Sequence, residues 1–177
     1  IAQLKKAGPA VGPAGSLGPM MSKAHFDKVL SYIDLAKAEG GRVLCGGEAV
    51  HGETGGWYIA PTVIEGLPMS ARSCQEEIFG PVITLHPFDN EAEAIALAND
   101  SSYGLAASIW TNDLARAHRL AAAIECGIVW INTWMQRDLR TPFGGMKQSG
   151  FGREGGMEAM TFFTEPKTVC IGALPNG

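Results

Sequence analysis

The stretch "GLAASIWTNDLARAHRLAAAIECGIVWIN", residues 104–132, decides the fold class of this 177-residue chain. Its first part is typical of a β-strand, its middle repeats apolar residues at helical spacing, and "GIVWIN" is typical of a second strand. Asn112 stands where a helix N-cap belongs, and Gly127 fits a C-terminal cap. This order predicts two parallel strands joined by a right-handed crossover.

The same order of elements occurs immediately upstream. "PVITLHPF" is typical of a strand and "NEAEAIALAND" of a helix with Asn90 as its N-cap. Two such units in sequence predict an α/β protein with an open, mostly parallel sheet and helices on both faces. Ligands of such sheets bind beyond the carboxyl ends of the strands, which directs attention to the loops after "GIVWIN" and around "EEIFGP".

The two ends of the chain carry further elements. A Gly/Pro-rich coil to about Gly18 precedes a helix that starts after Ser22 and ends near Gly40. "RVLCGG" and "WYIAPTVIEG" are typical of strands, and Pro61 should confine the second one to a sheet edge. We expect a short helix near residues 157–163, and then "KTVCIGAL" as an apolar strand without an evident partner in this chain.

Composition narrows the classes of partner and compartment. An apolar content of 46% with 18% charged residues fits a globular protein, and no apolar run approaches the roughly 20 residues of a membrane span. A net charge of −4 gives no reason to expect nucleic acid or an anionic membrane as a partner. The four scattered cysteines form no C-x-x-C pair, so we expect reduced thiols, no metal site and a cytoplasmic location.

A glycine pattern in "SGFGREGG" resembles a dinucleotide-binding fingerprint. Gly150, Gly152 and Gly155 have the G-x-G-x-x-G spacing. That fingerprint needs a preceding strand, and "TPFGGMKQ" is not typical of one. We therefore interpret the glycines as a bend rather than a pyrophosphate site.

Three longer motifs point to a known family. "EEIFGPV" (residues 76–82), "PFGGMKQSGFGRE" (142–154) and "FFTEPKTV" (162–169) resemble the aldehyde dehydrogenase superfamily in order and spacing, and the resemblance covers nearly the whole chain. Within the family, "NTWMQRDLRTPFGGMKQSG" is most similar to the branch that oxidises 2-aminomuconic semialdehyde, with the 2-hydroxymuconic branch as a near relative. That branch would place the protein in the kynurenine route.

The resemblance implies NAD-dependent oxidation of an aldehyde to a carboxylic acid. The family's nucleophilic Cys, general-base Glu, oxyanion-binding Asn and Rossmann-type domain would all precede Ile1, so the chain should be about the last third of such an enzyme and inactive alone. Residues 1–148 would belong to the catalytic domain, and residues 149–163 would return toward the cofactor domain. Residues 164–177 would form an oligomerisation strand and tail, which implies a homo-oligomer.

The resemblance also assigns roles to individual residues. Glu77 falls where a carboxylate binds the ribose hydroxyls on the nicotinamide side of NAD, and Phe79 where an aromatic ring packs near that ribose. Glu154 matches a glutamate in a proton path toward the general base; the alternative is a buried partner of a nearby Arg or backbone amide. Cys74 has no His or Lys beside it in sequence to activate its thiol, so we do not expect it to be a nucleophile.

The substrate residues would follow the strand "GIVWIN". Arg137 aligns with a substrate-tunnel position and could bind a substrate carboxylate, and it is preferred over Arg140. Its alternative is an exposed Arg paired with Asp138 or with an acidic residue at a subunit interface. Phe143 matches an aromatic wall of the tunnel, and Trp134 would be either a second wall residue or a core Trp.

Two other functions stay open. The chain could be a non-catalytic truncated or structural member of the family that only oligomerises. It could also belong to a branch that oxidises a neutral aldehyde such as retinal.

Overall fold

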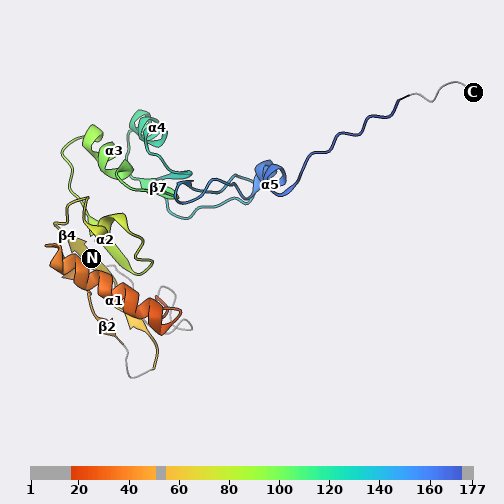
Figure 1. The fold of residues 1–177 in the computed structure, drawn as a ribbon. Helices are drawn as coiled ribbons and strands as arrows, with labels where there is room; N and C mark the ends of the chain where they lie inside the picture. The colour runs from red at the N-terminus through yellow and green to blue at the C-terminus, as the bar shows by residue number, and fades with distance from the viewer. Residues whose placement is uncertain (1–16, 51–54, 173–177) are drawn as a thin grey trace, which may run out of the picture. The chain divides into compact units, whose positions relative to one another are not determined.

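The computed structural model describes residues 17–50 and 55–172, which fall into two units (Figure 1). The first unit extends to Ser101 and the second begins at Ser102. Nearly all of the coil predicted before Gly18, and the end of the predicted tail, lie outside the described residues.

The first unit is built on helix α1 (Lys23–Ala38). The Ser22 hydroxyl accepts a hydrogen bond from the His25 backbone N–H at 3.2 Å and caps the helix, which begins where the sequence predicts. Val29, Ile33 and Ala36 are fully buried at helical spacing on one face. α1 packs against the following helix α2 (Arg72–Gln75) and against strands of this unit.

A three-stranded sheet lies in this unit, in the order β1 (Arg42–Cys45), β4 (Thr62–Glu65), β5 (Val82–Leu85). β1 is antiparallel and β5 parallel to β4. The edge position predicted from Pro61 is wrong, because β4 lies at the centre of the sheet. Pro61 precedes β4 instead of lying within it, so its missing N–H costs no ladder hydrogen bond.

Pro61 also divides the predicted strand "WYIAPTVIEG" into two. β3 (Tyr58–Ile59) ends before it and pairs antiparallel with β2 (Ala49–Val50) in a separate two-stranded sheet. Helix α3 (Glu91–Asn99) follows β5 and is capped by the Asn90 side chain, as predicted. The core of this unit consists of two clusters of buried apolar residues, Ala36, Ile64, Leu67 and Ala71 in one and Val29, Ile33 and Ile59 in the other.

The second unit contains the strand–helix–strand unit predicted from residues 104–132. β7 (Ala106–Ile109) and β8 (Ile128–Ile131) are parallel and are connected by α4 (Leu114–Ala123). The helix cap is Asp113 rather than Asn112, because the Asp113 carboxylate accepts the Arg116 backbone N–H at 3.0 Å.

Gly127 does not cap α4, which ends at Ala123. A Cβ on Gly127 would lie 1.6 Å from the carbonyl oxygen of Gly144, so glycine is needed here for close packing of two chain segments. A second, antiparallel pair joins β6 (Tyr103–Gly104) to β9 (Met146–Lys147). Helix α5 (Gly156–Phe163) confirms the short helix predicted there.

The described residues thus form a mixed α/β structure with four small sheets. Two of the sheets contain parallel pairs, but β5 and β7, expected in one sheet, belong to separate sheets. Residues 164–172 are exposed and pair with no strand among the described residues. Where the structure describes the chain, no helix is long and apolar enough to cross a membrane.

Candidate functional site

Segment 76–80, the "EEIFG" stretch, is attached to helix α1 through alternate residues. Ile78 packs against the buried cluster that contains Val29. Gly80 approaches the same side chain so closely that a Cβ would lie 2.7 Å from both γ-carbons of Val29. Glu76 also faces the helix, through the contacts described next. Three alternate residues of this segment are therefore held against α1.

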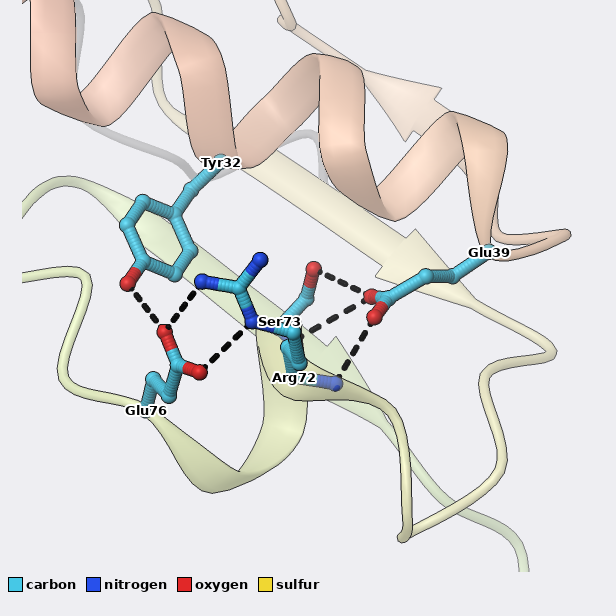
Figure 2. Close-up of polar contacts among 5 residues, drawn as sticks. All are labelled: Tyr32, Glu39, Arg72, Ser73 and Glu76. Carbon is cyan, nitrogen blue, oxygen red and sulfur yellow. Dashed lines mark hydrogen bonds and ion pairs between the residues drawn. The ribbon is translucent and has the colours of Figure 1, made fainter.

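Figure 2 shows how the Glu76 carboxylate is held from two sides. The Tyr32 hydroxyl on α1 donates to Oε2 at 2.5 Å, and the Arg72 guanidinium donates to Oε1 and Oε2 at 2.7 and 3.0 Å. These hydrogen bonds, those of Arg72 first, lower the pKa of Glu76 to about 2. The same carboxylate raises the pKa of Tyr32.

The backbone of Arg72 is fixed by Glu39, the residue that caps the C-terminus of α1. The Glu39 carboxylate accepts the backbone N–H groups of Arg72 and Ser73 at 2.8 and 3.2 Å, and the Ser73 hydroxyl at 2.7 Å (Figure 2). The hydroxyl contact is the main reason that the pKa of Glu39 is lowered. Glu39 thus fixes the start of α2, from which Arg72 reaches Glu76.

Glu77 and Phe79, the predicted cofactor residues, are the two members of the segment with exposed side chains. Their backbones are nevertheless held by α1. Lys28 Nζ donates to the Glu77 carbonyl at 2.8 Å, and His25 Nε2 lies 2.5 Å from the Phe79 carbonyl, to which its N–H can donate. Phe79 is 71% exposed and has a left-handed φ of 58°, which is costly for a residue with a side chain.

Phe79 also lines a depression of about 420 Å³, with His25, Gly80 and Pro81 among the other lining residues. The His25 ring lies 5.7 Å from the Phe79 ring. The sequence does not connect His25 with Phe79, because 54 positions separate the two residues. The sequence does show that His25 and Lys28, three positions apart, lie on the same face of the helix.

The predicted substrate residues Arg137 and Phe143 meet in the second unit. The Arg137 guanidinium lies 4.0 Å from the centroid of the Phe143 ring, and both line a cleft of about 240 Å³. Arg137 also forms an ion pair with Glu154 at 3.4 Å. The alternative pairing with Asp138 does not occur, because Asp138 binds Arg140 through contacts of 2.5 to 3.1 Å.

Trp130 and Trp134 lie in the same region but differ in burial. Trp134 is 63% exposed, so it is not a core residue, and it is not among the residues that line the cleft. It contacts Trp130 edge to face at 5.2 Å between ring centroids. Trp130 is the buried one, lines the cleft, and donates its indole N–H to the Gln136 carbonyl at 2.8 Å. The sequence indicates that Trp130 lies in a strand, but it carries no signal for the contact of Trp130 with the loop.

Glu154 lies opposite Phe143, with which it exchanges two backbone hydrogen bonds of 2.7 and 2.8 Å. Its side chain is 63% exposed, so the burial expected of a proton relay is not present among the described residues. The contact with Arg137 agrees with the alternative that Glu154 pairs with a nearby Arg, although the Glu154 side chain is not buried.

The glycines of "SGFGREGG" form a bend, as the sequence indicated. Gly150 and Gly155 have φ values of 127° and 77°, and a Cβ on Gly152 would lie 2.7 Å from the ring of Phe162. A two-residue strand, β9, does precede them, contrary to expectation. It is exposed and antiparallel to its neighbour, unlike the buried parallel strand of a dinucleotide-binding loop.

Cys74 is close to a histidine that sequence proximity did not show. Its Sγ lies 3.7 Å from His86 Nε2, which also contacts the Thr84 hydroxyl at 3.1 Å. Burial raises the pKa of the Cys74 thiol, which disfavours the thiolate. No group of three or more potential metal ligands occurs in residues 17–50 and 55–172.

The amino-acid sequence, including the "EEIFG" segment, is matched by a family model. The model, described as the aldehyde dehydrogenase family, matches residues 1–169, and the chain belongs to this family. Among curated relatives, it is 52% identical over 159 residues to a 2-aminomuconic 6-semialdehyde dehydrogenase of Pseudomonas sp., which covers 88% of this chain and 32% of the relative. It is 44% identical over 172 residues to the human 2-aminomuconic semialdehyde dehydrogenase, covering 94% and 35%.

Solved structures agree with this assignment. An indole-3-acetaldehyde dehydrogenase of P. syringae, solved with NAD+ and IAA, aligns with a TM-score of 0.86 and 43% identity over 90% of this chain and 32% of that one. The HpcC protein of Thermus thermophilus aligns with a TM-score of 0.88 and 41% identity, covering 99% and 36%. The chain thus spans about a third of the length of the relatives it matches.

Proposed function

We propose that this chain is a portion of an NAD-dependent aldehyde dehydrogenase that oxidises a carboxylate-bearing semialdehyde, such as 2-aminomuconic semialdehyde, to the carboxylic acid. The observation that carries the substrate class is Arg137, a cation beside the Phe143 ring at the cleft, while Asp138 is bound to Arg140. Similarity to semialdehyde dehydrogenases at 44% and 52% identity supports the same class.

Glu77 and Phe79 fit the cofactor. The exposed Glu77 carboxylate offers two acceptor oxygens, which suit the two adjacent hydroxyls of a ribose. The exposed Phe79 ring offers an apolar face beside it. NAD, which supplies the hydride acceptor when bound, is present in the solved structures of several relatives.

The substrate would be held by the cleft of the second unit. Arg137 would donate two parallel hydrogen bonds to the remote carboxylate, and the Phe143 ring would contact the unsaturated chain. The exposed Trp134 would extend this aromatic wall. Glu154 would orient Arg137, and burial of its carboxyl group by the rest of the protein would allow it to relay a proton.

The remaining assignments follow from the family. We propose that the nucleophilic Cys, the general base and the Rossmann-type domain lie in sequence that precedes residue 1, and that residues 1–148 and 149–163 complete the catalytic domain. We propose that the parallel pairs β4–β5 and β7–β8 belong to the open sheet of that domain. Residues 164–177 would add a strand to a second copy in a homo-oligomer, and the protein would act in the cytoplasm on the kynurenine route.

A neutral aldehyde is the second candidate, favoured by the similarity to an indole-3-acetaldehyde dehydrogenase. A test is the rate of NADH formation by the complete protein that contains this chain, with a panel of aldehydes of similar length with and without a carboxylate. A preference for the aldehydes that carry a carboxylate supports the proposal. A preference for neutral aldehydes such as retinal supports the second candidate, and a folded oligomer without activity supports a non-catalytic relative.

A further inference from the structure

We propose that Tyr32 and Arg72 are positioning residues for the cofactor: through the Glu76 carboxylate they fix the segment that presents Glu77 and Phe79. This inference rests on the proposed function, because it takes Glu77 and Phe79 as the cofactor contacts. Neither Tyr32 nor Arg72 would itself touch the cofactor.

Alternation along the segment is the first observation. Glu76, Ile78 and Gly80 face α1, while Glu77 and Phe79 have exposed side chains. Because the facing alternates, a shift of the segment by one residue would exchange the anchored residues for the presented ones. Holding Glu76 therefore holds the direction in which Glu77 points.

The second observation is the spacing of anchors on α1. His25, Lys28 and Tyr32 recur at three and four residues, so they lie on one face of the helix. They contact, in the same order, the Phe79 carbonyl, the Glu77 carbonyl and the Glu76 carboxylate. The helix thus holds the segment at three points along an antiparallel path.

The third observation is the geometry at Glu76. Both carboxylate oxygens are engaged by Arg72, and one also accepts from Tyr32, so the carboxylate cannot rotate without breaking a contact (Figure 2). Glu39 fixes the backbone of Arg72 in turn. Phe79 has an unfavourable backbone conformation, with φ at 58°. Without an anchor the segment would relax to a more favourable conformation, and Glu76, directly before Glu77, is the residue that prevents this.

The test is Tyr32→Phe in the complete protein, which removes one hydroxyl and keeps the ring. We expect the Kd for NAD+, measured by calorimetry, to rise about tenfold, and the KM for NAD+ to follow while the KM for the aldehyde stays unchanged. Arg72→Lys keeps the charge but loses the two-point contact, so it should shift the same two constants. Lys23→Gln is the matched control, because it breaks only the α1 surface pair of Lys23 with Asp27.

Glu77→Gln separates this inference from the proposed function. If Glu77→Gln weakens NAD+ binding but Tyr32→Phe and Arg72→Lys do not, the positioning inference is overturned and the cofactor assignment stands. If Glu77→Gln also leaves the Kd unchanged, the cofactor assignment itself fails. A rise in the KM for both substrates together with a lower unfolding temperature would show a merely structural role and overturn the inference.

Discussion

Replacement of Arg137 by Met in the complete protein tests the substrate class directly. The change keeps an unbranched side chain against the Phe143 ring, 4.0 Å from the present guanidinium, and removes the cation from the cleft. A hydrogen bond to a charged group contributes about 1.5–3 kcal/mol. Because the Arg137 side chain is 37% exposed, water screens the interaction and the lower half of that range applies.

The expected result is therefore a fall in kcat/KM of about 10- to 40-fold for a carboxylate-bearing semialdehyde, since about 1.4 kcal/mol corresponds to a factor of ten. Steady-state NADH formation measures it, with a neutral aldehyde of similar length as the second substrate. Arg140→Met is the matched control: it removes the same charge from the same loop, but Arg140 is 89% exposed and bound to Asp138. Equal losses on charged and neutral aldehydes, or an equal effect of Arg140→Met, would refute the role of Arg137.

Two further predictions concern stability. The pKa of Glu76 is lowered from 4.5 to about 2, so its contribution to stability is complete above about pH 4.5 and is lost as the pH falls toward 2. Urea unfolding should show the wild type losing more stability than Glu76→Gln across that window; parallel profiles would contradict it. Gly127→Ala should cost about 3 kcal/mol, because its Cβ would overlap the Gly144 carbonyl oxygen, whereas Gly18→Ala, with open space around it, should change stability by less than about 0.5 kcal/mol.

Most of the regular elements could be predicted from sequence, because their signals are local. Ser22 and Asn90 are side-chain caps, and the apolar spacing of α1 matches its buried face. The errors arose where a neighbour far along the chain decides the outcome. Gly127 is dictated by the approach of Gly144, and Pro61 was misjudged because only the sheet order shows that β4 is central.

The site residues divide in the same way. Motif positions such as Glu77 and Arg137 could be named from sequence, but their partners could not. Arg137 and Arg140 both lie within two residues of Asp138, and only the fold shows that Asp138 binds Arg140. The Tyr32 contact with Glu76 spans 44 positions, so no local pattern indicates it.

The proposed function is tested most directly by product formation by the complete protein with NAD+ and 2-aminomuconic semialdehyde. We expect NADH and the carboxylic acid to form in equal amounts, Glu77→Gln to raise the KM for NAD+, and Arg137→Met to raise the KM for the semialdehyde. A folded protein that binds neither NAD+ nor the semialdehyde, and forms no NADH, would contradict it.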